Sequence, residues 1–327
     1  MSSATKQRVK RKASIFSGIG IEIALVALIV IAAIASPDFL KINNVINVMR
    51  QVSVTGVIAV GMTIAIINGG IDISVCGIVG LSGMIAVMLQ DKGTIVAVLA
   101  AIGIGVLCGL LNGFCISRGL APFIVTLASD TVIRGLAYIT TNGQPISGVT
   151  DVYRWLGAGY VFKWQDAGGK TIGFPAPVLI FLLVLFLAHF MMTRTKFGRH
   201  IYAIGGNAEA ARLSGISIVK IKMSVYAISG ALAALSAIML TARMASCDPT
   251  LGTSYNVNAI SASVIGGASM AGGEGNVLKT LAGALIITIL SNVLNMRGVS
   301  TYWQQVVTGL IILVTVFVDN EKRRKNN

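Results

Sequence analysis

Two oppositely charged side chains, Asp130 and Arg134, lie four residues apart inside an apolar stretch of the chain. If the stretch is a helix, this spacing places both side chains on one face, where they can pair with each other. Charges inside a membrane helix are costly and usually face the interior of a bundle or a water-filled cavity. The spacing therefore allows two interpretations, a structural ion pair or a polar element of a solute path.

A second polar feature interrupts two apolar runs at residues 68–74, which we call the first break. It contains Asn68, paired glycines and Asp72. Irregular backbone is tolerated within a membrane only where it is buried in protein or lines a cavity, and its free amides and carbonyls can bind polar solutes. Asn68 and Asp72 are thus candidates for the solute path. The alternative is a plain tight turn with Asp72 as an N-cap.

A further glycine-rich segment at residues 266–276, the second break, has the same style of paired glycines and an acid between apolar runs. Two interrupted segments in the two halves of the chain are consistent with an internal pseudo-repeat.

The polar stretch 193–221 has the pattern of a short capped helix. Asn207 is placed to cap it, Glu209 falls in its first turn, Arg212 falls near its last turn and Gly215 can end it. With the small residues Gly205 and Ala210 beside these positions, the helix could dock into a soluble partner. The alternative is an ordinary surface helix between two membrane spans.

Motifs for covalent chemistry are incomplete in this sequence. The run 168–171 resembles the end of a phosphate-binding loop, but Trp164 stands where that loop needs a glycine. The two histidines lack a partner set for a metal or a catalytic triad, and the four cysteines form no CxxC pair. We therefore expect no metal, no cofactor and no enzymatic activity, and any energy for pumping must come from elsewhere.

The elements that carry these residues are predicted to be membrane helices. Hydrophobic residues make up 55% of the 327 residues and charged residues only 12%, and a bilayer core takes roughly 20 apolar residues per helix. Continuous rather than alternating apolar runs favour helices over a barrel. We expect an all-α integral membrane protein with about ten spans, near residues 18–36, 52–68, 73–89, 94–116, 122–141, 176–192, 222–242, 256–271, 278–295 and 301–318.

The net charge of +14 predicts the orientation of these spans. Cations gather in the tail 1–17, in the loop 193–221 and in the tail 319–327, and positive charge marks cytoplasmic segments. Both termini should then be cytoplasmic and the loop 142–175 should lie outside, so that the chain 1–327 forms a single transmembrane domain. No basic face with interleaved aromatic residues suggests nucleic acid as a partner.

Several stretches together resemble the sugar-type permease of bacterial ATP-binding-cassette importers, the ribose/xylose/galactose permease family. They occur in family order over nearly the whole chain: 69–75, 109–113, 122–127, 134–137, 140–146, the loop 197–216 and 264–269. The sequence departs from the family at Cys76, where glycine is usual, at Asp130, where an uncharged residue is usual, and at Asn256 and Asn258, where an acid is common.

The resemblance implies a permease subunit in a bacterial inner membrane that moves a ribose-like monosaccharide into the cytoplasm. It implies three partners: a separate ATPase that binds the ATP, an extracytoplasmic sugar-binding protein and a second permease copy, identical or paralogous, all in contact with membrane lipid. It also implies that the loop 193–221 couples to the ATPase, and that the solute path includes Asn112, Phe123, Asn142 and Gln144. Two alternatives stay open: a permease for branched-chain amino acids or another small organic solute, and an ion-coupled secondary transporter.

Overall fold

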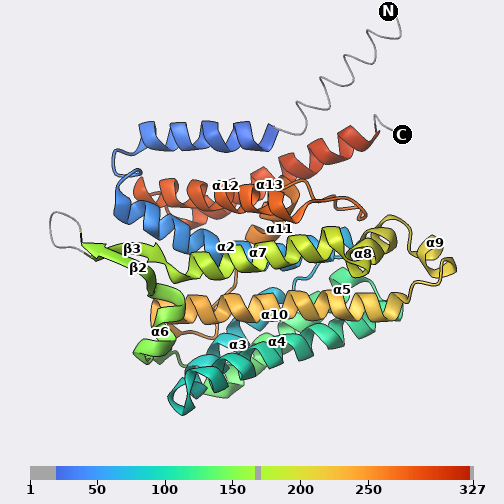
Figure 1. Cartoon of the computed structure of the whole chain (residues 1–327), viewed down its shortest axis with the longest axis horizontal. Coiled ribbons are helices and arrows are strands. Elements are labelled where there is room, and N and C mark those ends of the chain that lie inside the picture. The colour runs from blue at the N-terminus through green and yellow to red at the C-terminus, as the bar shows by residue number, and fades with distance from the viewer. Residues whose placement is uncertain (1–19, 166–170, 325–327) are drawn as a thin grey trace, which may run out of the picture.

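The computed structural model describes residues 20–165 and 171–324, and it is a bundle of long helices that run side by side (Figure 1). The long or apolar helices are Gly20–Ala35, α2 (Ile42–Ile67), α3 (Val75–Leu89), α4 (Thr94–Ser117), α5 (Pro122–Thr141), α7 (Ala176–Arg194), α10 (Ile218–Met244), α11 (Tyr255–Ile265), α12 (Val277–Met296) and α13 (Thr301–Arg324).

Among the described residues, seven helices are long and apolar enough to cross a membrane: α2, α3 with its 3-10 extension to Lys92, α4, α5, α7, α10 and α12. The first helix and the apolar part of α13 (Thr301–Val314) are shorter. The most apolar part of α2 is almost wholly buried, whereas α4 and α5 bury few of their residues and expose several large apolar side chains. Such large apolar surfaces are expected where lipid surrounds a protein.

Two predicted spans differ clearly in the structure: 52–68 belongs to a helix that begins at Ile42, and 256–271 is shorter than predicted. Helix α11 has only 11 residues and ends at Ile265, although the hydropathy continues beyond it. Gly267, Gly272 and Gly273 in the following segment all have positive φ values, a backbone conformation that ends a helix. The second break therefore takes up the whole of 266–276, between α11 and α12, and α11 is too short to cross a bilayer by itself.

The two ends of the bundle differ in structure (Figure 1). Helices α8 (Lys196–Gly206) and α9 (Ala208–Leu213) lie at one end, on the same side as the start of the first described helix and the end of α13. We call this the α9 end.

The opposite end, which we call the hairpin end, carries α6 (Asp151–Ala158) and two small antiparallel sheets. Strand β1 (Ile146–Ser147) pairs with β4 (Ser246–Cys247), and β2 (Tyr160–Gln165) pairs with β3 (Thr171–Pro175). The fold is therefore mostly rather than purely helical, because the segment predicted as an outer loop is itself structured.

Close packing of α4 against α10 depends on glycine. A Cβ atom added at Gly105 would lie 2.2 Å from the carbonyl oxygen of Gly230, and one added at Gly109 would lie 2.1 Å from that of Tyr226. Small residues at four-residue spacing let helices approach this closely. The contact presses Tyr226 against the first break, since its hydroxyl would lie 2.2 Å from a Cβ added at Gly70.

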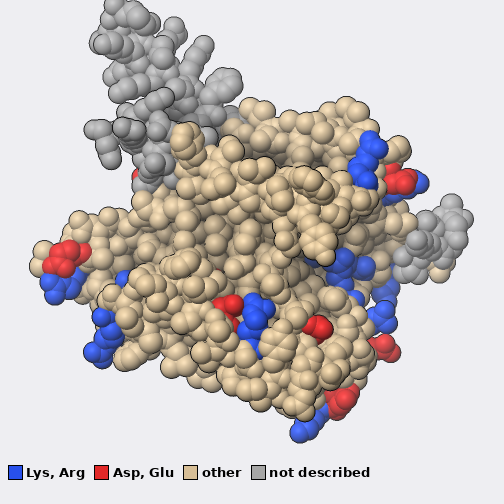
Figure 2. Space-filling view, turned by 180° about the vertical axis from the view of Figure 1, so that it is seen from behind, with Lys and Arg blue, Asp and Glu red and all other residues tan. Residues whose placement is uncertain are grey.

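Charged side chains are unevenly distributed on the face shown in Figure 2. They gather mainly toward the ends of the bundle, and a broad uncharged band lies between them, interrupted by a small group of acidic and basic side chains. This distribution agrees with a bundle that crosses a bilayer and has a few charged side chains between its two ends.

Candidate functional site

The first break separates α2, which ends at Ile67, from α3, which begins at Val75. Asp72 lies within it and is fully buried. Its Oδ1 accepts hydrogen bonds from the Ser74 amide at 3.1 Å and from the Ser74 hydroxyl at 2.5 Å, and Asn112 donates to that hydroxyl at 2.8 Å. The polar groups of the break are thus held inside the protein, and in this conformation Asp72 is shielded from any solute.

The second Asp72 oxygen, Oδ2, is buried without a hydrogen-bond partner among the described residues. The segment is therefore more than a tight surface turn, because a turn of that kind would leave its carboxylate to water.

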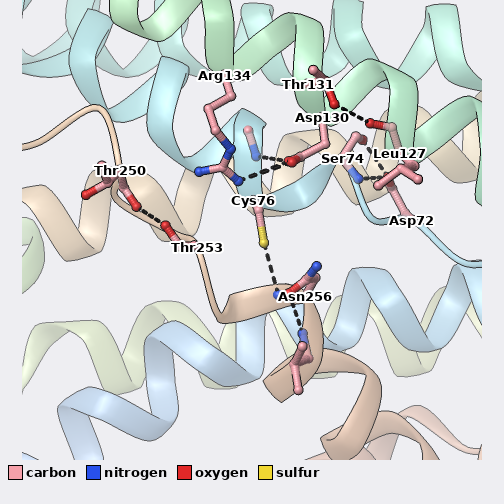
Figure 3. A network of polar contacts seen from close by, with 12 residues as sticks. Asp72, Ser74, Cys76, Leu127, Asp130, Thr131, Arg134, Thr250, Thr253 and Asn256 are labelled. Atoms are coloured by element: carbon pink, nitrogen blue, oxygen red, sulfur yellow. Dashed lines mark hydrogen bonds and ion pairs between the residues drawn. The ribbon is translucent and has the colours of Figure 1, made fainter. Parts of the chain in front are cut away.

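The charge pair on α5 forms as the sequence predicts. The Arg134 guanidinium lies 3.2 Å from Asp130 Oδ2, and the two side chains are 22% and 15% exposed. Asp130 Oδ1 also accepts the Gly77 amide at 2.6 Å, so the carboxylate lies at the positive N-terminal end of α3 (Figure 3). Asp130 therefore joins α5 to α3, and among the described residues Arg134 hydrogen-bonds to Asp130 through Nη2 alone.

A long-range contact brings the start of α11 to the same place. The backbone amide of Asn256 donates a hydrogen bond to the Cys76 thiol sulfur at 3.2 Å. Figure 3 shows the Cys76 side chain pointing from α3 toward Asn256. The chain before α11 is not helical yet inserts beside α3, since a Cβ added at Gly252 would lie 2.8 Å from the Cys76 carbonyl oxygen. Thr253 in this segment is exposed. In membrane proteins, non-helical backbone packed beside a buried helix commonly lines a water-filled cavity, so this segment is a candidate wall of a polar path.

Three segments far apart in sequence meet backbone to backbone at the α9 end. A Cβ atom added at Gly205 would lie 1.8 Å from the Ile67 carbonyl oxygen and 2.6 Å from the Gly273 amide nitrogen. One added at Gly272 would lie 2.9 Å from the Gly69 Cα. We call this contact of Gly69, Gly205, Gly272 and Gly273 the glycine junction. Only glycine allows such an approach, and the Gly273 amide donates to the Ile67 carbonyl at 2.8 Å across it.

Two side chains reinforce the glycine junction. The Tyr202 hydroxyl of α8 donates to the Gly275 carbonyl at 2.9 Å, and Asn68 donates to the Ile201 carbonyl at 3.5 Å. Helix α8 is thus hydrogen-bonded to both breaks. The first break leads into α3, and the second follows α11.

The predicted capped helix in the loop 193–221 is confirmed as α9. The Asn207 side chain accepts the Ala210 amide at 2.9 Å, and Gly215 follows the helix with a φ of 81°. Arg212 lies 2.6 Å from Glu209 and holds the pKa of that carboxyl below its usual value. The helix is exposed apart from Ala211, so its outer face is free for a partner.

The other candidates are spread along α5. Phe123 is 54% exposed, and it lies on the same face as Asp130 and Arg134, seven and eleven residues before them. Asn142 ends α5 in a left-handed conformation, and both it and Gln144 are exposed toward the hairpin end. The structure therefore separates these two from the polar network of Figure 3 by two helical turns or more.

Sequence reasoning missed Gly77 and the partnership of Cys76 with Asn256. The available signal was that Cys76 and Asn256 are unusual residue types for their positions. Their contact joins residues 180 positions apart, so no local sequence pattern predicts it.

Comparisons with known proteins agree with one another. The family described as branched-chain amino acid transport system, permease component, matches residues 44–316. The ribose import permease protein RbsC of Escherichia coli (strain K12) is 42% identical over 308 residues, covering 92% of this chain and 93% of that protein. RbsC of Bacillus subtilis (strain 168) is 40% identical, covering 97% of each. The xylose transport system permease protein XylH of E. coli K12 is 33% identical, covering 88% of this chain and 87% of that protein. No solved structure matches the chain at a significant level.

Proposed function

The chain belongs to the family of branched-chain amino acid transport system permease components, and we propose that it is the membrane subunit of an ATP-binding-cassette importer for a ribose-like monosaccharide. The observation that carries this proposal is its identity of 40–42% to ribose import permeases over more than nine-tenths of both chains. The xylose permeases, at 33%, are more distant. The protein would lie in a bacterial inner membrane and cross it ten times, with α11 and the second break together making one crossing, and both termini would lie in the cytoplasm.

Three partners complete this proposal. A separate ATPase would bind ATP and seat α9 at the cytoplasmic α9 end. An extracytoplasmic sugar-binding protein would dock at the hairpin end. A second permease copy, identical or paralogous, would face the exposed side of α5 across a central path. The exposure of α9 and of the α5 face that bears Phe123 and Arg134 supports these assignments.

The glycine junction suggests how a movement of the ATPases is transmitted to the solute path. Closure of the ATPases would move α9 and, through it, α8. The backbone of α8 contacts the backbones of both breaks directly. A shift of α8 would therefore move both breaks, because no flexible side chains lie between them to absorb the shift. The starts of α3 and α11 would follow, and with them the network around Asp130 and Arg134. Alternating access then needs two arrangements of the breaks while the long helices stay intact.

The roles of individual residues follow from this scheme. Arg134, Phe123 and Asp130 would face the solute directly, whereas Asp72 and Asn112 would hold the first break together from within. Asn207, Glu209 and Arg212 would shape α9 for the ATPase, and Gly215 would end it.

A second candidate function is import of a branched-chain amino acid, which the description of the matching family favours. Reconstituted importer, with its ATPase and binding protein, decides between them. We expect uptake of labelled ribose that excess leucine does not inhibit. Uptake of leucine with no uptake of ribose, xylose or galactose would overturn the monosaccharide assignment.

A further inference from the structure

A cavity of about 640 Å³ lies between α2, α11, α12 and α13. It is bordered by Gln51 of α2, Asn258 of α11, Ser291 of α12 and Gln305 of α13. Gln51 precedes Ile67, the last residue of α2 beside the glycine junction, by 16 positions, or about 24 Å of helix. The cavity is therefore nearer the hairpin end, from which a solute would arrive.

Most residues that border this cavity carry polar but uncharged side chains. Ten of the twelve have an amide or a hydroxyl group, and none is acidic or basic. Within a membrane bundle, a concentration of polar side chains around one space marks a place where polar contents are held.

Some of these side-chain amides form hydrogen bonds within the described part of the protein, and others do not. Gln304 donates to the Asn295 side chain at 2.8 Å and to the Val299 carbonyl at 3.0 Å, which fixes the wall between α12 and α13. In the part of the chain that the structure describes, the side chains of Gln51, Asn258 and Gln305 form no hydrogen bond. Each offers two donors and an acceptor to whatever occupies the cavity.

We propose that this cavity is a transit site for the sugar, on the way from the binding protein to the network around Arg134; the inference rests on the proposed function. A monosaccharide is neutral, and each hydroxyl both donates and accepts, as the free amides do. The volume lies within the range of small-molecule sites. A free amino acid would bring an ammonium and a carboxylate into a space without a countercharge, which is costly.

The cavity and the polar network share the first turn of α11. Asn258 faces the cavity, while the amide of Asn256, two residues earlier, is bonded to Cys76 beside the charge pair. A solute that leaves the cavity past the start of α11 would therefore move toward Cys76 and the charge pair.

The test uses the complete importer in proteoliposomes and an Asn258→Cys variant, with Cys108 and Cys115 changed to Ala because they are partly exposed. We expect a polar methanethiosulfonate reagent to modify the new thiol, and ribose to slow that reaction in a saturable way, about tenfold at ten times its dissociation constant. Leucine should not protect. Ser147→Cys, an exposed position on β1, is the matched control that ribose should leave unchanged.

A Gln305→Cys variant repeats the test from the opposite wall, in case the first variant assembles poorly. Modification that ribose does not slow, in liposomes that still import ribose, would overturn the transit site and leave the proposed function intact. A thiol that fails to react in both variants would also overturn it, because the cavity would then be closed to water. Import of leucine in place of ribose would overturn the proposed function and the site with it.

Discussion

Gly205→Ala is the change that bears most directly on the route from α9 to the path. The added methyl group would lie 1.8 Å from the Ile67 carbonyl oxygen, whereas real contacts of this kind are not shorter than 3.0 Å. The backbones of α8 and α2 must therefore separate by about 1.2 Å. The methyl group would also lie 2.6 Å from the Gly273 amide nitrogen, so it crowds both atoms of the 2.8 Å hydrogen bond from that amide to the Ile67 carbonyl, and the bond must break or lengthen.

Two costs follow from this separation. Overpacking costs roughly 1–3 kcal/mol, and a buried amide left without a partner costs about 1–3 kcal/mol more. The lower end of their sum, about 2 kcal/mol, already changes the population of the joined conformation relative to a separated one about thirtyfold. We therefore expect ribose uptake per ATP hydrolysed to fall by an order of magnitude or more, while basal ATPase activity persists.

The neighbouring glycine supplies the control. A Cβ atom added at Gly206 meets nothing within 4 Å, so Gly206→Ala makes the same chemical change one residue away without the clash. The assay is ribose uptake and ATP hydrolysis, measured in the same proteoliposomes, with a thermal midpoint in detergent to confirm assembly. Equal coupling in the two variants would refute the role of the glycine junction.

The other predictions concern the charge pair and α9. Arg134→Ala leaves Asp130 with fewer partners, and we expect uptake to fall more than the amount of assembled complex; wild-type uptake would reduce Arg134 to a structural role. Asn207→Ala removes the cap of α9 at a cost of about 1 kcal/mol, which should speed hydrogen exchange in α9, whereas Asn207→Ser should not. Arg212→Glu opposes Glu209 with a like charge and should uncouple the ATPase without preventing membrane insertion; unchanged stimulation of hydrolysis by the binding protein would contradict that role.

Features that depend on neighbours in sequence were predictable. The Asp130–Arg134 pair follows from the four-residue spacing of a helix, and α9 follows from the Asn cap, the acid in the first turn and the glycine after the end. Each of these is specified by a few consecutive residues.

Features that depend on tertiary approach were not predictable in the same way. Hydropathy favours one span across 256–271, but the positive φ values of Gly267 and Gly272 stop α11 early. The paired glycines around Gly69 and Gly205 identify segments that could bend or pack closely, yet nothing local indicates that they meet each other. The same is true of the amides around the cavity, which come from four helices.

The source of energy is the central claim, and one measurement tests it directly. Purified chain is placed in proteoliposomes with and without its ATPase and binding protein, and labelled ribose uptake is followed with ATP, with a proton or sodium gradient, and with neither. The account predicts uptake only when ATP, the ATPase and the binding protein are all present. Uptake by the chain alone, driven by an ion gradient, would contradict it and identify a secondary transporter.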